Sequence, residues 1–200
     1  HPTEADVART LVQALPHGAT LLVGNSLPVR DLDTYCRPLP HDHAPRVLHQ
    51  RGASGIDGLL AGAAGTRSVS TGPVALLLGD VSAQHDVGGM AALASVSGPL
   101  LVVIVQNGGG RIFEALPIGS APQAQPHFAR LFLTAGQIDF AHAAQSFGLD
   151  FARVHSSEDL QAAVQRGVTS DRPLIVEAVV PGAASARRRS DLWPRIAVAQ

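Results

Sequence analysis

The sequence predicts a doubly wound α/β fold, in which a mainly parallel sheet is flanked by helices. Val74–Leu78 and Leu100–Val105 are continuous apolar runs, typical of strands buried on both faces of a parallel sheet. Apolar runs also alternate with amphipathic stretches along the whole chain, which is the strand–helix–strand order of such folds. Ligands of these sheets bind at the carboxyl ends of the strands, so we expect a site near Gly24, Gly79 and Asn107.

The first part of the chain predicts a helix, two strands and a second helix. Thr3 and Asp6 have the spacing of a capping box. The apolar residues that follow share one helical face: Val7, Leu11, Ala14 and Leu15. Leu21–Val23 and Arg46–His49 are predicted strands. The Gly- and Ala-rich stretch Ile56–Ala64 is predicted to be a closely packed helix.

The later elements continue the alternation. Helices are expected at Val87–Val96, Ile138–Phe147 and Leu160–Val168. The first of these is the crossover between the two apolar runs, and Leu174–Val180 is the last predicted strand. Gly119–Gly136 contains two prolines and weak periodicity, so we expect a long surface loop there.

The composition excludes several kinds of chemistry. The chain has 200 residues, enough for one large domain, and its net charge of −1 argues against a nucleic-acid-binding or membrane-binding surface. All fifteen basic residues are arginine. Without lysine the chain can form neither a Schiff base nor a phosphate-loop lysine contact. An anion site would therefore use arginine or backbone amides.

Other features are better explained without a site. A single cysteine, Cys36, allows no intrachain disulfide, which suits the cytoplasm, and no motif around it indicates a nucleophile. The apolar run Leu100–Val105 is too short to span a membrane. We interpret Arg187–Arg189 as part of a solvated tail, and His41–His43 as a solvated loop rather than a zinc site.

Two polar pairs carry the predicted chemistry. Gly79-Asp80 and Gln106-Asn107 each follow an apolar strand directly, and a right-handed crossover would bring them to one edge of the sheet. Carboxylate and amide oxygens are suited to Mg²⁺. Water and phosphate oxygens complete the coordination shell of this ion. Gly108–Gly110 would let the backbone approach a diphosphate. The alternative is that Asp80 caps the next helix and the glycines only make a turn.

This pattern resembles the thiamine-diphosphate enzymes. Gly79-Asp80-Val81, then twenty-four residues, then Gln106-Asn107 is similar to their Gly-Asp-Gly…Asn-Asn motif. The resemblance implies Mg²⁺, or Mn²⁺, bound by Asp80, Asn107 and the Gly109 carbonyl. Val81 and Gln106 depart from the motif, but neither stands at a metal-ligand position.

Four stretches, spread over about residues 20–180, resemble one family within this group more closely. They are Gly24–Arg30, Arg51–Gly58, Gly79–Ser82 and Gly109–Phe113. Together they look like the 2-succinyl-5-enolpyruvyl-6-hydroxy-3-cyclohexene-1-carboxylate synthases of menaquinone biosynthesis. The resemblance implies an enzyme that decarboxylates 2-oxoglutarate and adds the resulting succinyl carbanion to isochorismate.

The resemblance also implies roles for individual residues. Ile56 would wedge between the two rings of a bent cofactor, and Arg30 and Arg51 would meet substrate carboxylates. The implied cofactor-binding residues are Ile56, Gly79, Asp80, Val81, Ser82, Asn107, Gly109, Gly110 and Ile112. The implied substrate-binding residues are Asn25, Ser26, Arg30, Arg51 and Phe113. His85 and Arg111 receive no role.

The family's domain organisation implies that part of the site lies elsewhere. Residues 1–180 would be the diphosphate-binding C-terminal domain, followed by a tail at 181–200. An N-terminal pyrimidine-binding domain and a central domain would precede them, and the activating glutamate would come from a neighbouring subunit of a homo-oligomer. We therefore expect that the chain, which begins at His1, is a piece of something longer and is inactive alone.

Three alternatives remain open. Another thiamine-diphosphate decarboxylase or acetolactate-type synthase would keep Asp80 and Asn107 but leave the Arg51–Gly58 match unexplained. A noncatalytic diphosphate-binding or nucleotide-binding module would use the same loops without turnover. A structural α/β domain would use none of them.

Overall fold

The sheet of the computed structural model has six strands, all parallel. The structure describes residues 1–40, 43–50, 55–183 and 186. The strands lie in the order β2-β1-β3-β4-β6-β5. Their bounds are β1 Thr20–Val23, β2 Arg46–Leu48, β3 Val74–Gly79, β4 Leu100–Gln106, β5 Asp150–Val154 and β6 Leu174–Val179. The predicted fold class is confirmed.

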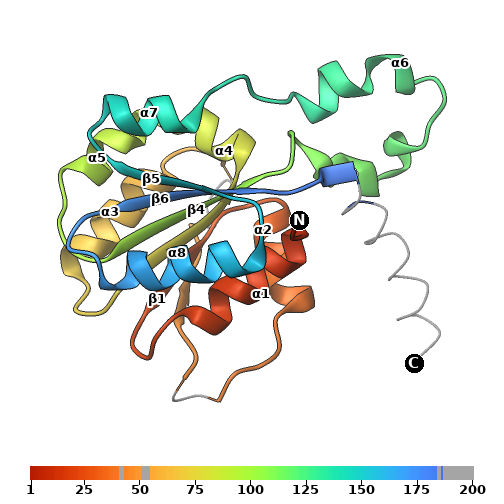
Figure 1. The fold of residues 1–200 in the computed structure, drawn as a ribbon. Coiled ribbons are helices and arrows are strands. Elements are labelled where there is room, and N and C mark those ends of the chain that lie inside the picture. The colour runs from red at the N-terminus through yellow and green to blue at the C-terminus, as the bar shows by residue number, and fades with distance from the viewer. Residues whose placement is uncertain (41–42, 51–54, 184–185, 187–200) are drawn as a thin grey trace.

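Helices cover both faces of this sheet (Figure 1). One face carries α1 (Glu4–Ala14), α2 (Leu27–Tyr35) and α8 (Ser157–Thr169). The other face carries α3 (Leu59–Val69), α4 (Asp80–His85), α5 (Met90–Ala94) and α7 (Phe140–Ser146). A further segment between β4 and α7 extends away from the sheet.

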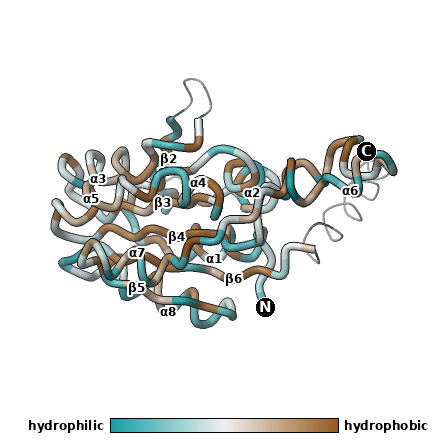
Figure 2. The backbone as a smooth tube through the Cα atoms, turned by 90° about the horizontal axis from the view of Figure 1, so that it is seen from above, coloured by the Kyte–Doolittle hydropathy of each residue, from teal (hydrophilic) through white to brown (hydrophobic). Residues whose placement is uncertain are grey.

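Strand residues alternate between two hydrophobic cores. In β3, Val74, Leu76 and Leu78 pack with α3 and α5, whereas Ala75 and Leu77 pack with α1 and α8. All five are at most 1% exposed. Because both faces of the central strands are covered, β3 and β4 are the apolar middle layer of the molecule (Figure 2).

The predicted capping box at the start of α1 is confirmed. The backbone N–H of Asp6 donates to Oγ1 of Thr3 at 3.2 Å, and the backbone N–H of Thr3 donates to Oδ2 of Asp6 at 3.0 Å. These bonds satisfy donors that the first turn of a helix leaves free. They also fix where the next residue, Glu4, enters the fold.

The predicted helices differ from the observed ones in their bounds. The helix expected at Ile138–Phe147 is α7, and the one expected at Leu160–Val168 is α8, which begins three residues earlier. The single helix expected at Val87–Val96 is instead a 3₁₀ turn at Val87–Gly89 (η1) followed by α5, and α4 precedes both. A Cβ at Gly89 would lie 2.9 Å from Cβ of Leu60, so the chain packs against α3 too closely for a side chain there. Similarly, α3 begins at Leu59 rather than Ile56, because Gly58 has a φ of 72° and stops the helix.

Several elements were not predicted. Strand β5 lies at the edge of the sheet and mixes exposed with buried residues, so it lacks an apolar run. Helix α2 begins within the Gly24–Arg30 motif, with Pro28 in its first turn, where proline is compatible with a helix. The expected surface loop at Gly119–Gly136 is largely exposed, but it contains α6 (Gln125–Phe128) and a π-helical turn, η4 (Ala129–Leu133).

No helix in the described part of the chain is long and apolar enough to cross a membrane. Most of the predicted tail at 181–200, including Arg187–Arg189, lies outside the described residues.

Candidate functional site

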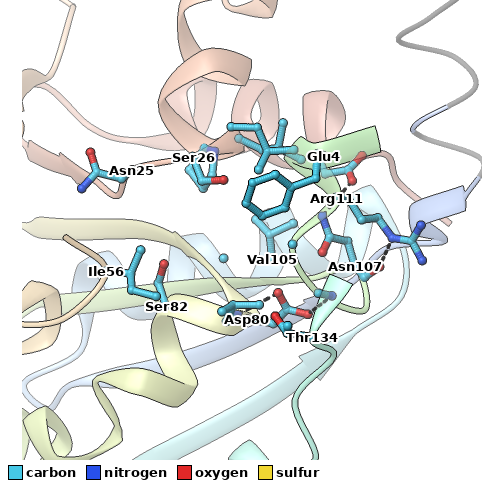
Figure 3. Close-up of a pocket in the computed structure, with 18 of the residues that line it drawn as sticks. Glu4, Asn25, Ser26, Ile56, Asp80, Ser82, Val105, Asn107, Arg111 and Thr134 are labelled. Atoms are coloured by element: carbon cyan, nitrogen blue, oxygen red, sulfur yellow. Dashed lines mark hydrogen bonds between the residues drawn. The ribbon is translucent and has the colours of Figure 1, made fainter. Parts of the chain in front are cut away.

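A cavity of about 200 Å³ opens at the carboxyl ends of β1, β3 and β4 (Figure 3). This is the edge of the sheet at which the sequence predicted a site. Ile56 and Ser82 lie on one side of the cavity, and Glu4, Asn107 and Arg111 lie on the other. Other lining residues come from α2, from the glycine loop after β4 and from η4.

Asp80 is the anchor of the glycine loop. Its Oδ2 atom accepts hydrogen bonds from the backbone N–H groups of Gly109, at 2.8 Å, and Gly108, at 3.0 Å. Its Oδ1 atom accepts one from the backbone N–H of Val81 at 2.8 Å. Gly108 and Gly109 have φ values of 81° and 116°, a conformation that strongly favours glycine. The carboxylate therefore joins the ends of β3 and β4, which lie at one edge of the sheet as predicted.

The electrostatic environment of Asp80 has opposing components. The residue is only 5% exposed, and burial raises the pKa of its carboxyl above the ordinary value. The backbone N–H groups of Val81, Gly109 and Gly108 act in the other direction and lower the pKa, but less strongly. A cation beside the carboxylate would stabilise its charged form further.

Asn107 is held by a residue that sequence reasoning did not select. Its Nδ2 atom donates to Oε1 of Glu4 at 3.0 Å, and both side chains are buried. Since the N–H end of the amide is directed at Glu4, the Oδ1 atom is the end available to a metal. Glu4 lies in the first turn of α1, which comes before β1 in the chain.

These groups fit a hard divalent cation. The Asp80 carboxylate, the Asn107 amide oxygen and the Gly109 carbonyl are all oxygen donors, the kind that Mg²⁺ and Mn²⁺ prefer. The Gly109 carbonyl also accepts the backbone N–H of Arg111 at 2.8 Å, which leaves its second lone pair for a metal. In the described residues no group of three His, Cys, Asp or Glu side chains could hold a metal. A site here would therefore combine the Asp80 carboxylate with amide and carbonyl oxygens.

The glycine at the end of β3 leaves room for a diphosphate, whereas the glycines after β4 pack against η4. A Cβ added at Gly79, which lines the cavity, would meet no atom within 4 Å, so the space beside it is open. At Gly110 a Cβ would lie 2.5 Å from the Phe132 carbonyl oxygen, so the loop is packed tightly against η4 on that side. The loop is thus fixed by η4 and Asp80 while the cavity beside Gly79 stays open.

Most of the predicted site residues line this one cavity. They are Asn25, Ser26, Ile56, Gly79, Asp80, Val81, Ser82, Asn107, Gly109, Gly110, Ile112 and Phe113. Their individual roles remain predictions. Phe113 is 37% exposed and its ring contacts Phe132 edge to face, with centroids 5.5 Å apart.

The two predicted carboxylate-binding arginines are not among the lining residues. Arg30 is exposed, lines an adjoining groove between α2 and the 3₁₀ turn η2 (Arg111–Ala115), and donates to the Ser26 carbonyl at 2.8 Å. Arg51 lies outside the described residues. His85 is also exposed and does not line the cavity.

Backbone strain gathers at the cavity. Among the described residues, Ser26 and Thr134 are the only non-glycine residues with positive φ, at 71° and 44°, and both line the cavity. Threonine is β-branched, which makes this conformation costly for Thr134. Such strain is commonly found at binding sites.

Several lining residues had no signal in the sequence. Glu4 lies in a segment predicted only as a helix, and Phe132 and Thr134 lie in a predicted loop. Asp31 follows the Gly24–Arg30 motif without belonging to it. Arg111 had no assigned role, but its Nε donates to the Asn107 carbonyl at 2.5 Å and its Nη1 to Glu114 at 2.7 Å. Arg111 thereby braces the backbone at Asn107.

A model of one protein family matches most of the chain. The family model of the thiamine pyrophosphate enzyme C-terminal TPP-binding domain matches residues 35–178. The matched region contains Asp80, Asn107 and the glycine loop.

Three curated relatives share one description, 2-succinyl-5-enolpyruvyl-6-hydroxy-3-cyclohexene-1-carboxylate synthase. The protein from Sorangium cellulosum is 47% identical over 195 residues, which cover 96% of this chain and 31% of the relative. That from Edwardsiella ictaluri is 40% identical, covering 97% of this chain and 33% of the relative. The protein from Halobacterium salinarum is 37% identical, covering 96% of this chain and 32% of the relative. The chain thus spans about a third of the length of these relatives.

Solved structures show the same fold at low sequence identity. The thiamine diphosphate-dependent 4-hydroxybenzoylformate decarboxylase of Rhodococcus jostii RHA1 matches with a TM-score of 0.72 and 19% identity, covering 89% of this chain and 32% of that one. The benzoylformate decarboxylase of Polynucleobacter necessarius matches with a TM-score of 0.69 and 16% identity. The match covers 89% of this chain and 33% of that one. The chain therefore belongs to the thiamine pyrophosphate enzymes and corresponds to their C-terminal TPP-binding domain.

Proposed function

We propose that this chain is the diphosphate-binding and metal-binding part of a 2-succinyl-5-enolpyruvyl-6-hydroxy-3-cyclohexene-1-carboxylate synthase. The observation that carries the proposal is the Asp80 carboxylate, which is bonded to the glycine loop beside Asn107 at the edge of the sheet. The curated relatives with this description cover nearly the whole chain, which favours this synthase over other thiamine-diphosphate enzymes.

In this proposal Asp80, Asn107 and the Gly109 carbonyl hold Mg²⁺, or Mn²⁺, against the diphosphate of thiamine diphosphate. The bound cofactor supplies an electron sink for decarboxylation. The chain's own part is to hold the metal ligands rigidly. Glu4 orients the Asn107 amide, and the two backbone N–H groups of the glycine loop fix the Asp80 carboxylate.

The proposed substrates are 2-oxoglutarate and isochorismate, both rich in carboxylates. Arg30 and Arg51 are the proposed cationic groups for them, with Ser26 and Phe113 at the cavity wall. Arg30 lines a groove of about 560 Å³ that shares Ile112 and Phe113 with the cavity. A substrate that reaches from the cavity into this groove would come within range of its guanidinium. Arg30 and Arg51 would then favour substrates that carry carboxylates, through charge-assisted hydrogen bonds.

The remaining parts of the proposal concern the whole protein. The activating glutamate, a pyrimidine-binding domain and a central domain would come from outside this chain, in a cytoplasmic homo-oligomer whose subunits share active sites. No nucleic acid or membrane takes part. The 200 residues alone would not turn over substrate.

The experiment uses the full-length protein that contains this chain, with thiamine diphosphate and Mg²⁺. Carbon dioxide release from 2-oxoglutarate is followed with and without isochorismate, in the wild type and in Asp80→Ala. Release that requires isochorismate and is lost in Asp80→Ala is the expected result. Release indifferent to isochorismate would indicate another decarboxylase, and no release despite bound cofactor would indicate a noncatalytic module.

A further inference from the structure

The loop that carries Ile56 is held at both ends by buried polar side chains from other elements. Gly55 to Gly58 precede α3, and in this loop Ile56 lines the cavity. Asn25 comes from the turn after β1, and Asp86 follows α4. Sequence reasoning gave Asp86 no role and assigned Asn25 to the substrate.

At the first end, Nδ2 of Asn25 donates to the carbonyl of Gly55 at 2.5 Å. Asn25 is 7% exposed, and this bond spans thirty residues of sequence. The contact fixes the backbone directly before Ile56. Asn25 lines the cavity as well, but its amide N–H group is committed to the loop.

At the second end, Asp86 binds the start of α3 with both carboxylate oxygens. Oδ1 accepts the backbone N–H of Gly58 at 3.0 Å, and Oδ2 accepts that of Leu60 at 2.6 Å. Gly58, the residue before the helix, has no side chain that could do this, so Asp86 acts as a cap supplied from another element. Asp86 is 8% exposed.

The attachment of Asp86 is itself rigid. A Cβ at Gly89 would lie 2.9 Å from Cβ of Leu60 and 3.0 Å from Oδ1 of Asp86, so the turn after α4 is packed directly onto α3. Helix α4 begins with Asp80. The backbone next to Ile56 is thus tied, through one six-residue helix, to the proposed metal ligand.

We propose that Asn25 and Asp86 are positioning residues for Ile56, which they hold at a fixed place in the cavity by binding the loop on either side of it. The inference rests on the proposed function, in which Ile56 packs against the two rings of thiamine diphosphate. Loosening either end lets Ile56 move. It removes no hydrogen bond of Asp80, Asn107 or the glycine loop. Substitution of either residue should therefore lower the reactivity of the bound cofactor and leave its affinity almost unchanged. A displacement of about 1 Å at a reacting centre can lower a rate about 100-fold.

The test uses the full-length protein with saturating thiamine diphosphate and Mg²⁺, and measures two quantities. The first is the rate at which the C2 proton of the bound cofactor exchanges with deuterium, read by NMR after acid quench. The second is the dissociation constant of the cofactor, measured by calorimetry. The variants are Asp86→Asn, Asn25→Ala, Ile56→Ala and the double variant Ile56→Ala/Asp86→Asn. Asp57→Asn, an exposed change in the same loop, is the matched control.

We expect Asp86→Asn and Asn25→Ala to slow C2 exchange by about 10- to 100-fold. Their cofactor dissociation constants should stay within about threefold of wild type, because the metal ligands are unchanged. The double variant should be no slower than Ile56→Ala alone, since residues that act through one another are not additive. Asp57→Asn should match the wild type.

Unchanged exchange in Asp86→Asn and Asn25→Ala would overturn the proposal. So would a double variant whose defect is the product of the two single defects, since Asp86 would then act on something other than Ile56. If Asp86→Asn does not fold, Asn25→Ala and its double variant with Ile56→Ala decide the question alone. Wild-type protein that does not bind thiamine diphosphate, or exchanges its C2 proton no faster than free cofactor, would instead refute the proposed function.

Discussion

The side chain of Asn107 donates a hydrogen bond to the carboxylate of Glu4, 3.0 Å away and 103 residues earlier in the chain. The bond joins the first turn of α1 to the end of β4, inside the cavity. This bond fixes which end of the Asn107 amide faces Glu4 and which end stays available in the cavity. Helix α1 is therefore part of the site, in addition to packing on the sheet.

Replacing Glu4 with glutamine should weaken metal binding. Glutamine keeps the size of the side chain but loses the charge-assisted bond that orients the Asn107 amide. Loss of a group that orients a metal ligand typically lowers metal affinity about 10- to 100-fold. The measurement is a Mg²⁺ titration of thiamine diphosphate binding by the full-length protein. Glu158→Gln, an exposed change in the first turn of α8, is the control, and equal affinities in the two variants would contradict the prediction.

Removing Arg153 should destabilise the domain more than removing Arg172. Arg153 donates to Glu177 at 2.7 Å, and the Glu177 side chain is only 6% exposed, so the loss leaves a buried carboxylate without its ion pair. Since Arg153 itself is 43% exposed, water offsets part of the effect, and we expect a loss of about 1–2 kcal/mol in the free energy of unfolding.

Arg172 provides the comparison, because its ion pair with Asp150 spans 3.7 Å and both side chains are more than half exposed. Its replacement by alanine should cost less than about 0.5 kcal/mol. Denaturant unfolding of Arg153→Ala and Arg172→Ala measures both, in the transition that includes this domain. A smaller cost for Arg153→Ala than for Arg172→Ala would refute the assignment of a buried ion pair.

Thr134→Gly should leave stability unchanged or raise it slightly. Thr134 has a φ of 44°, which glycine adopts readily, so relief of strain offsets the larger entropy of the unfolded glycine chain. Thr66→Gly, within α3, should instead cost about 0.5–1 kcal/mol, because it places glycine in a helix and removes the bond from Thr66 Oγ1 to the Gly62 carbonyl. Thermal unfolding compares the two variants. A larger loss for Thr134→Gly would mean that its side chain, and not its backbone, is what the site requires.

Cys36 should react slowly with iodoacetamide. Burial raises the pKa of its thiol above the ordinary value, and the nearby charge of Arg9 lowers it by less. Because the thiolate is the reactive form, the rate at pH 8 should be below that of a free small thiol and should still rise above pH 9. Mass spectrometry of the Cys36 peptide gives the rate, with the denatured protein as the reference. Full reactivity at pH 7 would indicate an activated cysteine instead.

The sequence predicted that Asp80 and Asn107 meet at one edge of the sheet, because the signal for this is local. Asp80 and Asn107 each follow a strand that is buried on both faces, and the parallel order of β3 and β4 brings such strand ends together. The Gly108–Gly110 run was recognised for the same reason. These residues are close in space because neighbouring elements of the chain are neighbours in the sheet.

The features that the sequence did not predict are two polar contacts and one strand. They depend on tertiary contacts or on a mixture of polar and apolar residues. Glu4 reaches Asn107 only because α1 packs across the sheet, and nothing in the first turn of a capped helix indicates that. Asp86 binds backbone atoms of α3, which no side-chain pattern reveals. Strand β5 lies at an edge, where only part of its surface is buried, so it lacks the apolar run of β3.

The most direct measurement is a calorimetric titration of thiamine diphosphate into the full-length protein, with Mg²⁺ present, for wild type, Asp80→Asn and the exposed control Asp159→Asn. Asp80→Asn should lose at least about 100-fold in affinity, while Asp159→Asn should bind as the wild type does. Asp80→Asn that remains folded and binds the cofactor with wild-type affinity would contradict the assignment of this edge of the sheet as the metal-diphosphate site.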